Sequence, residues 1–154
     1  MQLSTHITLD EFTESTTARR RSINNDLPIE LHTQAKATAA MLERIRSHLC
    51  SLSGKSIPIN ITSGYRCLLL NQAIGSRSTS DHVQALACDF KAPEFGDAHA
   101  VSKALSTVVD VLSIGQLIFE FSSWVHVSTR IPDKIINRIL TIDGLGVRAG
   151  IREG

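Results

Sequence analysis

The sequence has few cysteines: Cys50, Cys67 and Cys88 are the only three among its 154 residues. Their number is odd, and no two of them stand at the CxxC spacing of a zinc ribbon. Such cysteines are typical small apolar residues that stay reduced, which excludes a disulfide-stapled miniprotein. A chain of this length buries about 68–70% of its unfolded surface, so it needs no staples. We therefore expect residues 1–154 to form a single domain that folds in a cytosol.

Long apolar runs and an excess of either charge are also missing. The first twelve residues carry Thr, His, Asp and Glu where a signal peptide needs an apolar stretch, and no later run reaches membrane-spanning length. Lys and Arg number 16 against 15 Asp and Glu. This balance gives no global reason for a nucleic-acid or membrane partner, and the Arg19–Arg21 triplet is expected to be solvated surface. We expect neither a signal peptide, nor membrane insertion, nor nucleic-acid binding.

What the sequence does have is a helical pattern early and an alternating pattern later. Thr8 and Glu11 form the capping-box pair that opens a helix. Apolar residues spaced three or four apart predict further helices, which gives helices over 9–15, 28–49, 68–74 and from Asp97 onward. Alternation predicts strands over 57–61, 85–91, 116–121 and 124–129. The order indicates an α+β domain with a small, mainly antiparallel sheet and helices packed on one side.

Three side chains that could hold a metal ion stand where the pattern aims them into one cleft: His82, Asp89 and His126. Alternation places Asp89 with two alanines on one face of its strand and the apolar residues, Cys88 among them, on the other. Two imidazoles and a carboxylate leave a fourth zinc position open for water, as in catalytic sites. The alternatives are a hydrogen-bonded cluster without an ion and, for Asp89, a cap at a strand end.

A candidate general base depends on the register of the last two strands. A two-residue loop, Ser122 and Ser123, would turn Glu120 away from His126, whereas a three-residue loop from Ser122 to Trp124 would pair the two directly. The three-residue loop sorts the apolar residues to the core and the polar ones to the cleft: Leu117, Phe119, Phe121, Val125 and Val127 against Gln116, Glu120, His126 and Ser128. We therefore predict Glu120 as the base; the alternative is an exposed residue on an edge strand.

Arg66 follows the turn at Ser63 and Gly64, and its planar guanidinium suits a substrate carboxylate or an oxyanion. Its alternative partners are Asp81 and Glu94. Trp124 is expected to pack or to form a substrate-contacting cleft wall. A zinc ion that activates water and polarises a carbonyl, beside a carboxylate base, is suited to amide hydrolysis.

Together these residues resemble a known family. The motifs Ser63-Gly64-Tyr65-Arg66, Asn71, Ser80, His82, Ala87, Asp89-Phe90 and Trp124-Val125-His126-Val127-Ser128 are similar to those of the M15 zinc D-Ala-D-Ala carboxypeptidases and related phage cell-wall peptidases. The stretches 15–19 and 140–144, with Asn25, resemble the phage-encoded branch. The resemblance implies a Hedgehog/DD-peptidase-like fold. It also implies zinc ligation by His82, Asp89 and His126, acid/base catalysis by Glu120, and substrate or transition-state contacts by Arg66 and Ser80.

The function implied by the resemblance is hydrolysis of peptidoglycan stem peptides, by a carboxypeptidase or an endopeptidase, in an endolysin of a phage or prophage. Such a protein is expected to be a monomer, made in the host cytoplasm, that acts on the cell wall after holin-assisted release. Two positions depart from the pattern. A glycine common after the first histidine is Ala85, and a glutamate that many relatives carry before the last histidine is Ser123. The alternative is a non-catalytic wall-binding or virion protein that keeps the fold.

Overall fold

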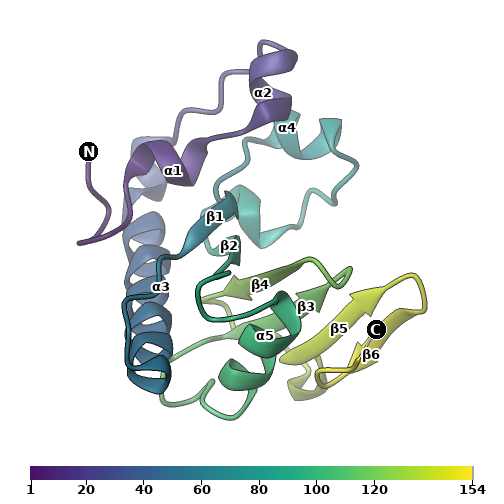
Figure 1. Ribbon diagram of the computed structural model, residues 1–154. Coiled ribbons are helices and arrows are strands. Elements are labelled where there is room, and N and C mark those ends of the chain that lie inside the picture. The colour runs from purple at the N-terminus through teal and green to yellow at the C-terminus, as the bar shows by residue number, and fades with distance from the viewer. Residues whose placement is uncertain (154) are drawn as a thin grey trace.

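A six-stranded sheet organises the fold in the computed structural model, which describes residues 1–153 (Figure 1). The strand order is β1-β2-β4-β3-β5-β6, so β1 and β6 form the two edges. The strands are β1 (Asn60–Ser63), β2 (Ala87–Lys91), β3 (Gln116–Glu120), β4 (Trp124–Ser128), β5 (Ile139–Asp143) and β6 (Gly146–Ala149). Neighbours are antiparallel except β3 and β5, which are parallel. The predicted α+β class with a mainly antiparallel sheet is confirmed.

Five α-helices accompany the sheet within the described chain: α1 (Leu9–Thr13), α2 (Thr16–Arg20), α3 (His32–Ser53), α4 (Leu68–Ala73) and α5 (Ala98–Ser106). Short 3-10 turns lie at η1 (Ile29–Leu31), η2 (Asp81–Gln84) and η3 (Ile135–Asn137). The capping box predicted at Thr8 and Glu11 is present, with each side chain accepting the other residue's backbone N–H. Asp97 likewise caps α5 by accepting from the N–H of Ala100 at 2.8 Å. The helix starts at these positions are therefore encoded locally.

The core lies between the sheet and the two longest helices. The predicted apolar face of α3 is buried, from Ala35 to Leu49. α5 packs against β3, β4 and α3. The sheet contributes alternate residues, as predicted: Cys88, Phe90, Leu117, Phe119, Val125 and Val127 are all buried. The three cysteines are free thiols. The opposite face of the sheet, which bears Asp89 and His126, is thereby left for polar side chains.

Several predicted boundaries were wrong. No helix was predicted between residues 15 and 28, but Thr16–Arg20 form α2, which Ser15 caps by accepting from the N–H of Ala18. The first strand begins at Asn60 rather than at residue 57, although Ile57 and Ile59 are buried as its pattern required. The hairpin of β5 and β6 was not predicted as an element. Its contact with β3 is a parallel pairing, for which adjacent sequence carries no signal.

The hairpin between β3 and β4 corrects the predicted register. Glu120 pairs with Trp124, and His126 pairs with Ile118, so the predicted direct pairing of Glu120 with His126 was wrong. The loop does contain three residues, 121–123, and this odd length keeps Glu120 and His126 on one face. Phe121 and Ser122 both have left-handed φ, and the N–H of Ser123 donates to the Glu120 carbonyl, as in a type I′ turn. Phe121 is consequently 53% exposed and not part of the core.

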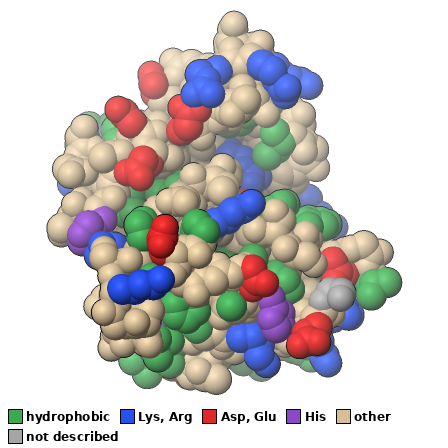
Figure 2. All heavy atoms as spheres, in the orientation of Figure 1, with side chains coloured by type: hydrophobic (Ala, Val, Ile, Leu, Met, Phe, Trp, Pro, Cys, Tyr) green, Lys and Arg blue, Asp and Glu red, His purple; other side chains and the backbone are tan. Residues whose placement is uncertain are grey.

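The surface is electrostatically mixed. Figure 2 shows acidic and basic side chains interspersed over one face, with basic ones gathered at the end formed by α2. Among residues 1–153, no helix combines the length and apolar character needed to cross a bilayer.

Candidate metal centre

Three donor atoms converge on the polar face of the sheet. They come from His82 on η2, Asp89 on β2 and His126 on β4, and all lie within 4.8 Å of one another; we call this group the His–Asp–His cluster. Asp89 Oδ1 lies 3.3 Å from His82 Nε2 and 2.8 Å from His126 Nδ1. The strand register explains part of this convergence, because Asp89 and His126 are direct cross-strand partners.

Backbone contacts orient His82. Its Nδ1 lies 2.7 Å from the carbonyl oxygen of Gly64, which can only accept, so Nδ1 carries the proton and Nε2 keeps its lone pair. Ser80 caps η2 by accepting from the His82 N–H at 3.3 Å. Histidines that ligate metals typically donate their other ring nitrogen to such a carbonyl. The contact with Gly64 therefore prepares Nε2 to bind an ion.

Burial and charge favour the protonation state that a metal ion requires at two of the three donors, Asp89 and His82. Burial alone would raise the pKa of Asp89, but the two imidazoles outweigh it and hold the pKa well below its ordinary value. Burial lowers the pKa of His82, although Asp89 opposes this, and the ring is therefore neutral at physiological pH. Burial alone would lower the pKa of His126, but the hydrogen bond and the charge of Asp89 outweigh it and raise that pKa. An ion arriving here would displace the proton of His126 Nδ1.

Glu120 lies at the edge of the cluster. Its Oε1 is 3.7 Å from His126 Nδ1, and burial raises the pKa of its carboxyl, with His126 opposing the shift. A carboxyl with a raised pKa holds a proton more readily than an ordinary glutamate does, which suits a group that takes up a proton and passes it on. Because β3 is flanked by β4 and β5, Glu120 does not stand on an edge strand. Trp124 is its direct cross-strand partner.

Arg66 approaches the cluster from the other side. One of its terminal nitrogens lies 3.3 Å from Asp89 Oδ2, and its Nε donates to Ser63 Oγ at 3.0 Å. Its third contact is with the side-chain oxygen of Asn71. The alternative partners weighed from the sequence are not used: Asp81 pairs with Arg130 instead. Arg66 therefore lies close to the carboxylate of the cluster, with a side chain only 12% exposed.

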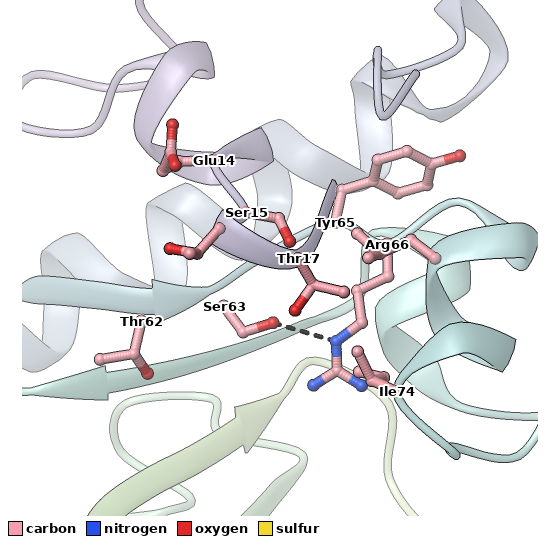
Figure 3. A pocket seen from close by; sticks show the side chains of 10 residues that line it. Glu14, Ser15, Thr17, Thr62, Ser63, Tyr65, Arg66 and Ile74 are labelled. Carbon is pink, nitrogen blue, oxygen red and sulfur yellow. Dashed lines mark hydrogen bonds between the residues drawn. The ribbon is translucent and has the colours of Figure 1, made fainter. Parts of the chain in front are cut away.

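One cavity borders the cluster itself, and a second borders Arg66. One, of about 520 Å³, is lined by Glu120 and His126 together with Ser80 and other residues of the loop after α4. The other, of about 270 Å³, lies beyond Arg66 between α2 and β1 (Figure 3). Its lining includes Arg66 and the hydroxyl-bearing side chains of Thr16, Thr17, Thr62 and Ser63. The cluster thus stands between two spaces that a substrate could enter.

Asn25, Thr38 and Ala85 support the site from behind, and the sequence named only Asn25 and Ala85, without the contacts that they make. Asn25 accepts from the N–H of Cys67 at 2.7 Å and donates to the carbonyl of Tyr65 at 2.9 Å, which fixes the segment that carries Arg66. Ala85 has a φ of +58°, the left-handed conformation that glycine adopts most readily. Its carbonyl accepts from the buried hydroxyl of Thr38 at 2.8 Å. The resemblance noted a glycine that is common at this position in the family. A glycine there would adopt the same left-handed φ without strain.

A comparison with known protein families settles the class of this protein. The model of the peptidase M15 family matches residues 5–128, which include the His–Asp–His cluster, Glu120 and Arg66. This chain belongs to the peptidase M15 family. No curated protein matches it. Peptidases of the M15 family are zinc-dependent, so the protein is a metallopeptidase by class, and the sequence resemblance to this family is confirmed.

The donor set fits the zinc ion of the M15 peptidases. Two imidazole nitrogens and one carboxylate oxygen are the ligand types of a catalytic zinc site with an open fourth position. Asp89 is held anionic, and His82 is oriented by Gly64 with Nε2 toward the cluster. Both features are those expected of ligands in a zinc site.

Proposed function

We infer that this protein is a zinc peptidase that hydrolyses peptide bonds in the stem peptides of bacterial peptidoglycan. The observation that carries the inference is the His–Asp–His cluster, with three donor atoms within 4.8 Å, between Glu120 on one side and Arg66 on the other. Metal ligands, a carboxyl of raised pKa and a guanidinium in one place are the parts that amide hydrolysis uses.

Each side chain has a role in this reaction. His82, Asp89 and His126 would hold the zinc ion, which when bound would supply a water of lowered pKa and polarise the carbonyl of the scissile bond. Glu120 takes the proton from the attacking water and passes it to the leaving amine, because its burial favours the protonated form between these steps. Arg66 stabilises the negative charge that develops on the carbonyl oxygen.

The setting that we propose is lysis by a phage or prophage. Support comes from the resemblance of residues 15–19, Asn25 and 140–144 to the phage-encoded branch of the family. In this setting the protein acts as a monomer on the cell wall after holin-assisted release from the cytoplasm.

Peptidoglycan digestion tests the activity. Zinc-loaded protein should release new amino groups from purified walls, lose this activity with a chelator and regain it with zinc. Glu120→Gln should lower kcat by about 10²–10⁴-fold while zinc content stays at one per chain. Glu30→Gln, which makes the same change at an exposed position of η1, is the control.

A parallel pair of variants tests the ligands. His126→Ala should reduce zinc content sharply, whereas His48→Ala, outside the cluster, should not. Zinc binding with wall binding but no bond cleavage would refute the peptidase and leave a wall-binding module. A chain that binds no zinc would refute the site itself.

A further inference from the structure

The sheet face that carries the His–Asp–His cluster continues beyond it. His126 pairs with Ile118 of β3, and Ile118 pairs with Leu140 of β5. In the next row, Glu120 pairs with Ile142, which pairs with Val147 of β6. Cross-strand partners share a face, so Leu140, Ile142 and Val147 extend the floor beside Glu120. Val147 is 63% exposed, which leaves apolar surface open at the far end of this floor.

This floor belongs to the cavity of about 520 Å³, which we call the hairpin groove. Its opposite wall is the loop after α4, residues 76–81. Pockets of about 300–1,000 Å³ hold drug-sized ligands, so the hairpin groove can hold more than one small amino-acid residue. Because its lining includes Glu120 and His126, it is continuous with the proposed catalytic centre.

The charged side chains that line the hairpin groove favour a ligand with a negative charge. Arg77 and Arg130 both line it, and Arg130 is neutralised by an ion pair with Asp81 at 2.7 Å. Arg77 is exposed and pairs with no carboxylate among residues 1–153. The wall opposite the apolar floor therefore offers an uncompensated cation. The complementary ligand is a peptide with small apolar side chains and a carboxylate.

The position of Glu120 decides which part of a substrate lies here. In the proposed reaction Glu120 gives its proton to the leaving amine, so that nitrogen must lie beside its carboxyl group. Glu120 borders the hairpin groove, whereas Arg66 lies on the other side of the cluster. The amine-bearing half of the substrate is therefore the half that the groove receives.

We propose that the hairpin groove binds the substrate peptide on the leaving-amine side of the scissile bond, with a carboxylate of that segment paired to Arg77. The β5–β6 hairpin, which follows the span matched by the family model, supplies the floor. The proposal rests on the proposed peptidase function. It makes the protein an endopeptidase, because a carboxypeptidase that removes one residue would leave most of the groove empty.

Binding of a product-like peptide tests the groove without requiring catalysis. The probes are an alanine-rich tetrapeptide with a free amino terminus and a free C-terminal carboxylate, and the same peptide as its C-terminal amide. Calorimetry on zinc-loaded protein should show the carboxylate form binding about tenfold more tightly. In Arg77→Glu this ratio should fall to about one. Arg20→Glu, the same charge change on exposed α2, should keep the wild-type ratio.

A second pair of variants tests the floor. Val147→Asp should weaken binding of the carboxylate peptide, whereas Leu145→Asp, at the exposed tip of the same hairpin, should not. A ratio that survives Arg77→Glu, or a peptide that fails to bind at millimolar concentration, would overturn the proposal. Peptide binding with these dependences but without wall hydrolysis would refute the peptidase alone. Hydrolysis without these dependences would refute the groove alone.

Discussion

Gly64 connects the packing of the core to the orientation of a metal-competent histidine. Its carbonyl accepts the proton of His82 Nδ1 at 2.7 Å, and the next N–H, from Tyr65, donates to the carbonyl of Phe12 at 2.8 Å. A Cβ placed on Gly64 would lie 2.8 Å from Phe12 Cδ2 and closer still to the Phe12 carbonyl oxygen. Phe12 is fully buried and cannot swing aside. We therefore predict that Gly64→Ala displaces the backbone that holds His82.

The expected cost has two parts. Overpacking of a filled core costs about 1–3 kcal/mol, and the backbone contact here lies at the upper part of that range. Loss of the hydrogen bond that orients a metal-ligating histidine lowers metal affinity by about 10–100-fold. Gly64→Ala should therefore lose about 2–3 kcal/mol of unfolding free energy in the metal-free protein and bind zinc at least about tenfold more weakly.

Urea unfolding and zinc titration against a competing chelator measure the two effects separately. The control is Gly144→Ala, the same change in the turn between β5 and β6, where an added Cβ meets nothing within 4 Å. It should change stability by less than about 0.5 kcal/mol and leave zinc affinity unaltered. If Gly64→Ala matched this control in both assays, the proposed coupling between Phe12 and His82 would be refuted.

Three further substitutions test other parts of the structure. Asn25→Ala removes three hydrogen bonds to backbone groups and should cost about 2–4 kcal/mol in urea unfolding, with a larger KM because the segment carrying Arg66 loosens. Burial alone would raise the pKa of Glu43, but hydrogen bonds that include those from His6 lower it below its ordinary value. The stability that the ionised carboxylate contributes is therefore present above the unfolded pKa and is lost as pH falls through the folded pKa. Glu43→Gln should therefore lose less stability than wild type between pH 5 and pH 3, measured by thermal melts. Ala85→Gly should change unfolding free energy by less than about 1 kcal/mol, because relief of a left-handed conformation offsets the lost methyl group and the added chain entropy.

Local signals in the sequence were sufficient for part of this structure. The start of α1 depends on Thr8 and Glu11, which lie within one helical turn, and the faces of β2 follow from strict alternation around Asp89. Such patterns report which side of a strand a residue takes, and this was enough to place Asp89 and His126 on one face. The odd loop length after Glu120 came from the same kind of argument.

What the sequence could not supply depends on particular backbone geometry and distant pairing. The turn after Glu120 places Phe121 and Ser122 in left-handed conformations. Gly or Asn usually occupies such positions, and because neither is present here, the sequence did not show where the turn lies. The contact of the Gly64 carbonyl with His82 joins residues eighteen positions apart through a backbone atom. No pattern of side chains in the sequence shows which carbonyl group accepts a hydrogen bond, so this contact could be found only from the structure.

The parallel pairing of β5 with β3 has a consequence for how far the chain can be shortened. The N–H groups of Leu117 and Phe121 donate to carbonyls of Arg138 and Ile142, at both ends of this pairing. A chain cut after residue 128 would leave β3 as a bare edge, open to pairing with other molecules. The span shared with the family is thus smaller than the unit that keeps Glu120 on an interior strand, and a shortened chain should aggregate before its chemistry can be measured.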